Sequence, residues 1–143
     1  MPVNQHVLWS HQTELAPDAV SAPRARAFIT RHLVEHATPA FLVDDIQLVG
    51  TELATNALRH ARTSFTVTLS GCEDAVRLDV RDGSPKRPRP RTAGPYDTGG
   101  RGLAIVGEVS HAWGVAAAAD GTKSVWASFD TRLRAIDAGE LDA

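Results

Sequence analysis

The chain has 143 residues, of which 22% are charged, and a formal net charge of -2, values that are ordinary for one globular domain. The single cysteine, Cys72, excludes an internal disulfide framework and a cysteine-rich zinc site. The acidic net charge, the lack of any apolar run near ~20 residues and the lack of a signal-peptide pattern predict a cytoplasmic protein that contacts neither nucleic acid nor membrane.

The first half of the chain is expected to hold an edge strand and two helices. Residues 6–14 are compatible with the strand. Ser21, followed by Pro23, is typical of a helix start with the serine hydroxyl as the cap, and helical spacing extends over 22–37. A second helix is predicted from about residue 42 to 60, because its apolar positions form one continuous stripe of Leu42, Ile46, Val49, Leu53 and Ala57.

Two strands joined by a hairpin come next. Apolar residues alternate with polar ones over 65–69 and again over 76–80. Residues 83–100 then break all periodicity and are rich in proline and glycine. A loop of this length inside a compact domain is usually functional or disordered.

The last part of the chain returns to regular structure. A helix is predicted from Gly102, followed by a strand at 113–117, a turn at 120–121 and a strand at 125–129, with a polar tail at 131–143. Because the strands meet mainly through hairpins, the order of elements favours an α+β two-layer sandwich over a doubly wound fold. We expect a mixed, largely antiparallel sheet with the helices on one face.

One group of polar residues lies along the second predicted helix. Glu52, Asn56 and His60 are spaced by four residues, so they share one side of the helix beside its apolar stripe. A carboxylate next to an amide oxygen suits hydrated magnesium, which prefers oxygen ligands and is usually shared with phosphates. The simpler alternative is a solvated helix face.

A second candidate is Asp82, where a predicted strand opens into the long loop. A carboxylate at a strand end can accept a hydrogen bond from an exocyclic amine such as that of adenine. The commoner reading of an aspartate before a glycine is a turn.

A third candidate is the glycine-rich segment before the last predicted helix. Free backbone N–H groups at a helix start bind anions, and glycine lets phosphate oxygens come close to the backbone. An arginine there adds a charged fork for a terminal phosphate. The alternative is a hinge without a ligand. The segment consists of Thr98, Gly99, Gly100, Arg101, Gly102 and Leu103.

These three motifs, in this order, resemble the small ATP-binding proteins of the anti-sigma-factor serine kinase type. Those proteins belong to the histidine kinase-like ATPase superfamily, shared with gyrase, the ninety-kilodalton chaperone and mismatch-repair ATPases. The resemblance covers residues 8–130 and implies the Bergerat ATP-binding fold. It implies that Asn56 binds Mg²⁺, that Glu52 is the general base and that Asp82 binds the adenine amino group.

The resemblance assigns the glycine segment to a flexible ATP lid at 83–100. The lid motif G-x-G-L, which closes over the triphosphate, matches Gly100, Arg101, Gly102 and Leu103. The segment around Gly121 resembles the family's last strand, in which a hydroxyl lies near adenine. Spacing does not decide between Thr122 and Ser124 for that contact.

The resemblance implies an ATP-dependent serine/threonine protein kinase that regulates transcription. Its cofactors are ATP and Mg²⁺, and its implied partners are an anti-anti-sigma antagonist that it phosphorylates, a sigma factor that it sequesters and a second copy of itself. One departure matters: the family's D-x-G-x-G becomes Asp82 followed by Gly83, Ser84, Pro85 and Lys86. A catalytically weak, nucleotide-dependent partner switch is therefore the alternative, and the ATP module of a histidine-kinase relay is a third.

Two further motifs have simpler interpretations. His32, Glu35 and His36 match the inverted zinc-protease string H-x-x-E-H, but no third ligand set follows in the sequence. We therefore interpret the two histidines as a surface or helix-packing pair. The basic, proline-rich tract at 85–91 lacks interleaved aromatic residues, so we assign it to the lid rather than to a nucleic-acid site.

Overall fold

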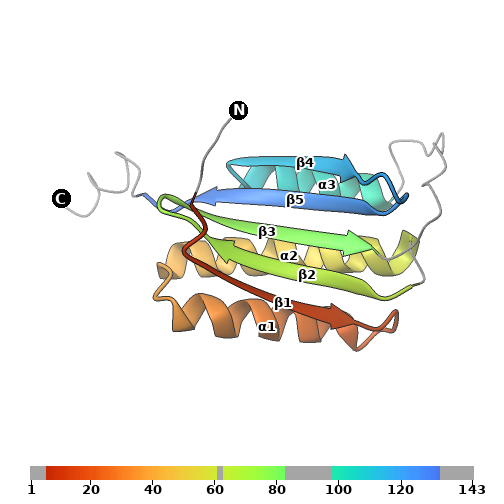
Figure 1. Ribbon diagram of the computed structural model, residues 1–143, viewed down its shortest axis with the longest axis horizontal. Coiled ribbons are helices and arrows are strands. Elements are labelled where there is room, and N and C mark those ends of the chain that lie inside the picture. The colour runs from red at the N-terminus through yellow and green to blue at the C-terminus, as the bar shows by residue number, and fades with distance from the viewer. Residues whose placement is uncertain (1–5, 61–62, 83–97, 133–143) are drawn as a thin grey trace.

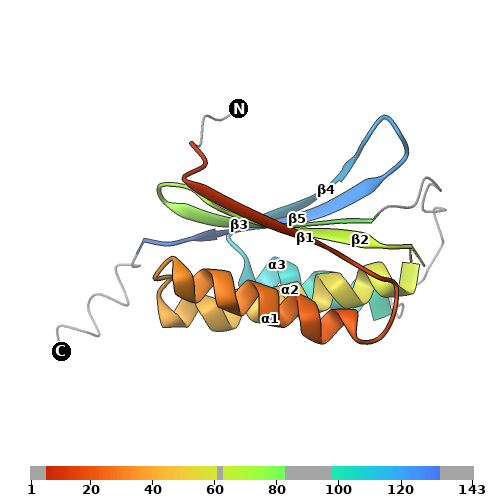
Figure 2. The same cartoon turned by 60° about the horizontal axis from the view of Figure 1, so that its bottom comes forward.

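The computed structural model of the chain describes residues 6–60, 63–82 and 98–132. In this part of the chain one sheet forms one layer, and the helices lie together against one of its faces (Figures 1 and 2). The predicted α+β two-layer architecture is therefore confirmed. The elements are β1 (Trp9–Leu15), α1 (Ser21–Glu35), α2 (Ala40–His60), β2 (Phe65–Gly71), β3 (Ala75–Asp82), α3 (Thr98–Val109), β4 (Ala112–Ala117) and β5 (Lys123–Asp130).

The sheet has the strand order β1-β2-β3-β5-β4. All four pairings are antiparallel, so the described strands form a wholly antiparallel sheet where a mixed one was expected. After β3 the next described element is α3, on the helix-covered face of the sheet, and the outer strand β4 follows before β5 returns between β4 and β3 (Figure 1). This return makes β3 and β5 neighbours, paired along their whole length.

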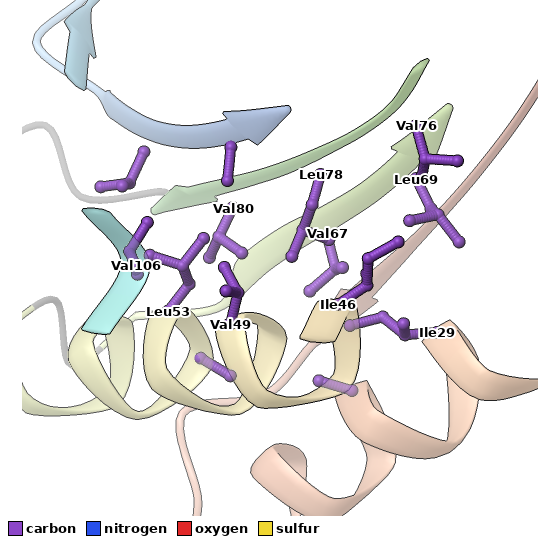
Figure 3. Close-up of a cluster of buried hydrophobic side chains, with 14 of the residues drawn as sticks. Ile29, Ile46, Val49, Leu53, Val67, Leu69, Val76, Leu78, Val80 and Val106 are labelled. Atoms are coloured by element: carbon purple, nitrogen blue, oxygen red, sulfur yellow. The ribbon is translucent and has the colours of Figure 1, made fainter. Parts of the chain in front are cut away.

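The core fills the space between the sheet and α2. Every second residue of β2, β3 and β5 points toward the helices, as period-two alternation requires, and all of these are buried except Lys123 at the start of β5. The predicted apolar stripe of α2 meets these side chains, and all five of its residues are at most 7% exposed. Figure 3 shows Ile46, Val49 and Leu53 of α2 pointing at Val67, Leu78 and Val80 of the sheet.

The start of α1 differs from its prediction. Ser21 is the first residue of the helix rather than its cap, and no side chain among the described residues caps α1. The Ser21 hydroxyl instead donates to the carbonyl of Ala16 at 2.5 Å, while the Asp18 carboxylate accepts from the N–H of Val20 at 3.0 Å. The predicted cap is wrong because the buried hydroxyl of Ser21 is used to tie the helix to the chain that precedes it.

The start of α3 also differs. The helix begins at Thr98, four residues before the predicted start at Gly102. Glycine disfavours helix interiors, but packing outweighs propensity where a helix has a buried side to hold it. Here Val106 is fully buried and Leu103 packs against the core. The glycines therefore lie within the first turns of α3.

The remaining boundaries agree with prediction to within about two residues for most elements. β1 forms an edge strand, and the turn between β4 and β5 uses Gly121 at a φ of 91°, a conformation that favours glycine. Of the predicted lid, 83–97 lie outside the described residues, as do 133–143 of the predicted tail. Within the described ranges no helix combines the length and apolar character needed to cross a bilayer.

Candidate functional site

A small pocket opens between α2 and the adjacent strands β3 and β5. Its walls combine apolar side chains with a carboxylate, an amide and an ammonium group. It is lined by Leu53, Asn56, Ala57, Val80, Asp82, Lys123 and Val125. Two of the predicted site residues, Asn56 and Asp82, thus come together although they are far apart in the sequence.

Asp82 reaches this pocket because of strand alternation. It is the last residue of β3, two residues after Val80, so it continues the row of side chains that points toward the helices. Only 9% of Asp82 is exposed, which makes it a buried carboxylate at the end of an otherwise apolar row. Burial of a carboxylate costs free energy unless its oxygens accept hydrogen bonds, so a buried carboxylate is a strong acceptor for a ligand N–H group.

Asn56 reaches the pocket from α2. It lies three residues after buried Leu53, at the border between the apolar stripe and the exposed side of the helix. Glu52, one turn earlier, is half-buried but is not among the residues that line the pocket. The structure therefore brings Asn56 to Asp82 and leaves Glu52 on the neighbouring part of α2.

Lys123 is a pocket residue that sequence reasoning missed. It is the first residue of β5 and lies directly opposite Asp82 in the antiparallel pairing. Directly opposite side chains in such pairs are neighbours, and opposite charges there are favourable. The signal was present in the alternation, because counting back by two from the buried residues Phe129, Ala127 and Val125 reaches Lys123.

Thr122 lies outside the pocket lining. Its hydroxyl donates to Asp120 Oδ1 at 2.7 Å and accepts from Nη2 of Arg81 at 2.9 Å. Arg81 alternates with Asp82 and therefore belongs to the sheet face away from the helices. The Thr122 hydrogen bonds, from its side chain and then its backbone, together with the Arg81 charge, hold the pKa of Asp120 below its usual value.

Ser124, the other candidate for the adenine hydroxyl, lies opposite Arg81 on that same face of the sheet. Neither hydroxyl lines the pocket between α2, β3 and β5. The contact of Thr122 with adenine stays a prediction.

The glycine segment forms the N-terminal turns of α3. The first N–H groups of a helix have no partner inside the helix, and that end carries a partial positive charge. The backbones of Gly100, Arg101 and Gly102 lie in these turns, and Leu103 packs against the core. In Figure 1 this end of α3 lies at the same end of the molecule as the end of β3 that carries Asp82.

The residues present fit a purine nucleotide and a hard metal ion. Apolar walls from Leu53, Val80 and Val125 suit a flat aromatic ring, and a buried carboxylate suits the amine on such a ring. The amide oxygen of Asn56 is a ligand type that Mg²⁺ accepts. Positive charge from Lys123 and from the start of α3 suits phosphate groups.

Comparison with known proteins agrees with this chemistry. The sequence matches the family model of the histidine kinase-like ATPase domain over residues 15–129, which is most of the chain. No curated protein matches the sequence closely enough to count as a relative. The matched range starts at the end of β1 and ends in β5, so it contains the pocket, α3 and all of α2. The chain therefore belongs to the histidine kinase-like ATPase family, whose domains bind ATP.

Proposed function

We propose that the chain is an ATP-dependent serine/threonine protein kinase of the anti-sigma-factor type, which phosphorylates an anti-anti-sigma antagonist. The main support for nucleotide binding is that Asn56 and Asp82 line the same pocket between α2, β3 and β5. The kinase part rests on the resemblance of the three motifs to that family.

In this proposal Asp82 selects the base. Its buried carboxylate accepts the exocyclic N–H of adenine, which guanine lacks at that position. Leu53, Val80 and Val125 contact the faces of the ring and exclude water from it. A hydrogen bond to a charged acceptor contributes about 1.5–3 kcal/mol, so Asp82 alone accounts for roughly a tenfold or larger preference.

The phosphates are held from two elements. Asn56 supplies an oxygen ligand for Mg²⁺, which neutralises charge on the phosphate oxygens when it is bound. The N–H groups of Gly100, Gly102 and Leu103 and the guanidinium of Arg101 bind the phosphates themselves. Catalysis of phosphoryl transfer consists mainly of such positioning and charge stabilisation.

Glu52 acts as the general base. It orients the serine hydroxyl of the antagonist and accepts its proton, while the bond between the γ-phosphorus and the bridging oxygen of ATP breaks, the phosphoryl group passes to the serine oxygen, and ADP leaves. Its place on α2, one turn from Asn56, supports this role because base and metal ligand then sit on one rigid element. We further propose that the protein works in the cytoplasm as a homodimer and that its second partner is a sigma factor.

A second candidate function is a nucleotide-dependent partner switch with little catalysis. The sequence after Asp82 favours it, because Ser84 and Lys86 replace both glycines of the family's D-x-G-x-G pattern and a proline, Pro85, stands between them. Such a protein binds its antagonist differently with ATP and with ADP but transfers no phosphate.

The experiment incubates the purified chain with Mg-ATP labelled on the γ-phosphate and with candidate antagonists from the same genome. The kinase proposal predicts stable label on an antagonist serine, found by mass spectrometry, and loss of that label in Glu52→Gln with ATP binding retained. Transfer retained by Glu52→Gln would remove the base role. Nucleotide-dependent binding of the antagonist without label would replace the kinase by the partner switch.

A further inference from the structure

Three histidines and a glutamate gather between β1 and the end of α1, away from the nucleotide pocket. His11 of β1 pairs with Leu69 of β2, whereas Asp82 pairs with Phe65, so the two places are displaced along the sheet and separated by β2. His32 and Glu35 come from the last turn of α1, and His36 is the residue that follows it. This group, His11, His32, Glu35 and His36, is called the histidine cluster below.

Two ring nitrogens of the histidine cluster, one from His11 and one from His36, point at each other. Nε2 of His11 lies 2.9 Å from Nε2 of His36. Ligand atoms of His11, Glu35 and His36 all lie within 4.8 Å of one another. His32 does not complete this triangle, because its Nδ1 bonds Oε2 of Glu35 at 3.2 Å instead.

Packing holds the rings in place. The Trp9 ring is stacked on His36 with centroids 4.0 Å apart and planes 1° apart. His11 is stacked on His32 at 3.8 Å, and Phe28 meets the edge of His32 at 4.7 Å. Rings fixed in this way lose little conformational freedom when a ligand binds, which favours affinity.

The short contact between the two Nε2 atoms has a chemical consequence. Only one proton fits between them, so one nitrogen donates and the other accepts. Removal of that proton leaves two lone pairs that face the same point, beside a carboxylate.

Two imidazoles, one carboxylate and one water form a common ligand set for zinc. Tetrahedral zinc with Zn–N bonds of about 2.0–2.1 Å places two ligand nitrogens roughly 3.3 Å apart. The observed 2.9 Å therefore needs to open by only a few tenths of an ångström. Partial exposure of Glu35, whose side chain is 45% accessible, leaves a way in for the ion and its water.

We infer that His11, Glu35 and His36 form a binding site for a divalent cation of the zinc class. His32 is a positioning residue in this site, because its hydrogen bond orients the Glu35 carboxylate. The bound ion replaces the proton between the two Nε2 atoms and links the edge strand β1 to α1. The H-x-x-E-H string thus supplies two ligands, His36 and Glu35. The third ligand, His11, lies in a strand more than twenty residues earlier, so the local spacing of the string does not predict it.

The experiment titrates Zn²⁺ into metal-stripped full-length protein by calorimetry. We expect one ion per chain, and at least tenfold weaker binding in His11→Gln and in His36→Gln. His111→Gln is the matched control, because His111 is an exposed histidine outside the cluster, and it should bind zinc as the unaltered protein does. Zinc at about a hundredfold excess over its Kd should raise Tm by roughly 5–10 °C in the unaltered protein and in this control.

A second readout uses Trp9. Because its ring is stacked on His36, Cu²⁺ bound in the cluster should quench part of the tryptophan fluorescence, and Trp9→Phe should remove that part. Absence of stoichiometric binding, or equal zinc affinity in the unaltered protein and both cluster variants, would overturn the inference. Circular dichroism confirms that the variants fold, and Glu35→Gln replaces any that does not. ATP titration of the same variants keeps this test separate from the nucleotide site, since the cluster shares no residue with it.

Discussion

Asp82 and Lys123 lie directly opposite each other where β3 and β5 pair, and both side chains line the same pocket. The pairing exists because β5 returns between β3 and β4. It sets a carboxylate and an ammonium group at one end of an apolar surface, which is a suitable arrangement for an aromatic ring that carries phosphates.

The first prediction concerns the recognition of adenine by Asp82. Asp82→Asn replaces a charged acceptor by an amide that also presents donors, so ATP affinity should fall about tenfold or more. Asp79→Asn is the control, because Asp79 lies on the same strand but on the opposite face, bonded to Arg77 at 2.9 Å. Calorimetric titration of both variants measures the effect. Equal affinities in the two variants would place the adenine elsewhere.

The second prediction concerns Thr122, whose hydroxyl joins Asp120 to Arg81 across the β4–β5 turn. Thr122→Val removes the hydroxyl's hydrogen bond to Asp120 and those from Nε and Nη2 of Arg81, which should lower the free energy of unfolding by about 1 kcal/mol, measured by urea titration. The same variant reports on the adenine contact. If ATP affinity falls while Ser124→Ala leaves it unchanged, Thr122 also contacts the nucleotide.

Most of the fold could be predicted from the sequence. The inward-facing rows of β2, β3 and β5 and the apolar stripe of α2 were assigned correctly, because burial on one side makes apolar residues recur at a regular spacing. The starts of α1 and α3 were not, since Ser21 uses its hydroxyl for a tertiary contact and packing of Val106 keeps glycines in a helix.

Part of the candidate pocket could be predicted. Asn56 and Asp82 were singled out from their motifs, and both line one pocket, while the role of each stays a prediction. Lys123 was missed because a charged residue at a strand end looks like surface. The histidine cluster could not be assembled from spacing, because its contacts join β1 to α1 through the sheet register and the packing of Trp9.

The third prediction concerns Gly71, which lies opposite Trp9 in the β1–β2 pairing. A Cβ at Gly71 would overlap the indole ring, so Gly71→Ala should push Trp9 off His36 and cost about 1–3 kcal/mol of stability. Urea unfolding measures the cost, and the tryptophan emission spectrum reports the move. A variant of unchanged stability and emission would show that the ring adapts freely.

The fourth prediction concerns the stability of the folded protein at low pH. Hydrogen bonds from the Arg132 side chain, then from its backbone, and its charge lower the pKa of Asp130 from 3.8 to about 2. Because the pKa is lower in the folded state, the stabilisation from this pair is present above about pH 4 and is lost as the pH falls toward 2. An NMR titration of the Asp130 carboxyl should show this low midpoint, and Arg132→Gln should move it upward. A midpoint near 3.8 in the unaltered protein would contradict the pairing.

The most direct test of the nucleotide site is a calorimetric titration with ATP, with and without Mg²⁺, beside Asn56→Ala. We expect saturable binding that depends on magnesium, and a loss of at least tenfold in affinity in Asn56→Ala, because the amide oxygen that would hold the metal is gone. Absence of binding at millimolar ATP, or identical binding by both proteins whether or not magnesium is present, would contradict it.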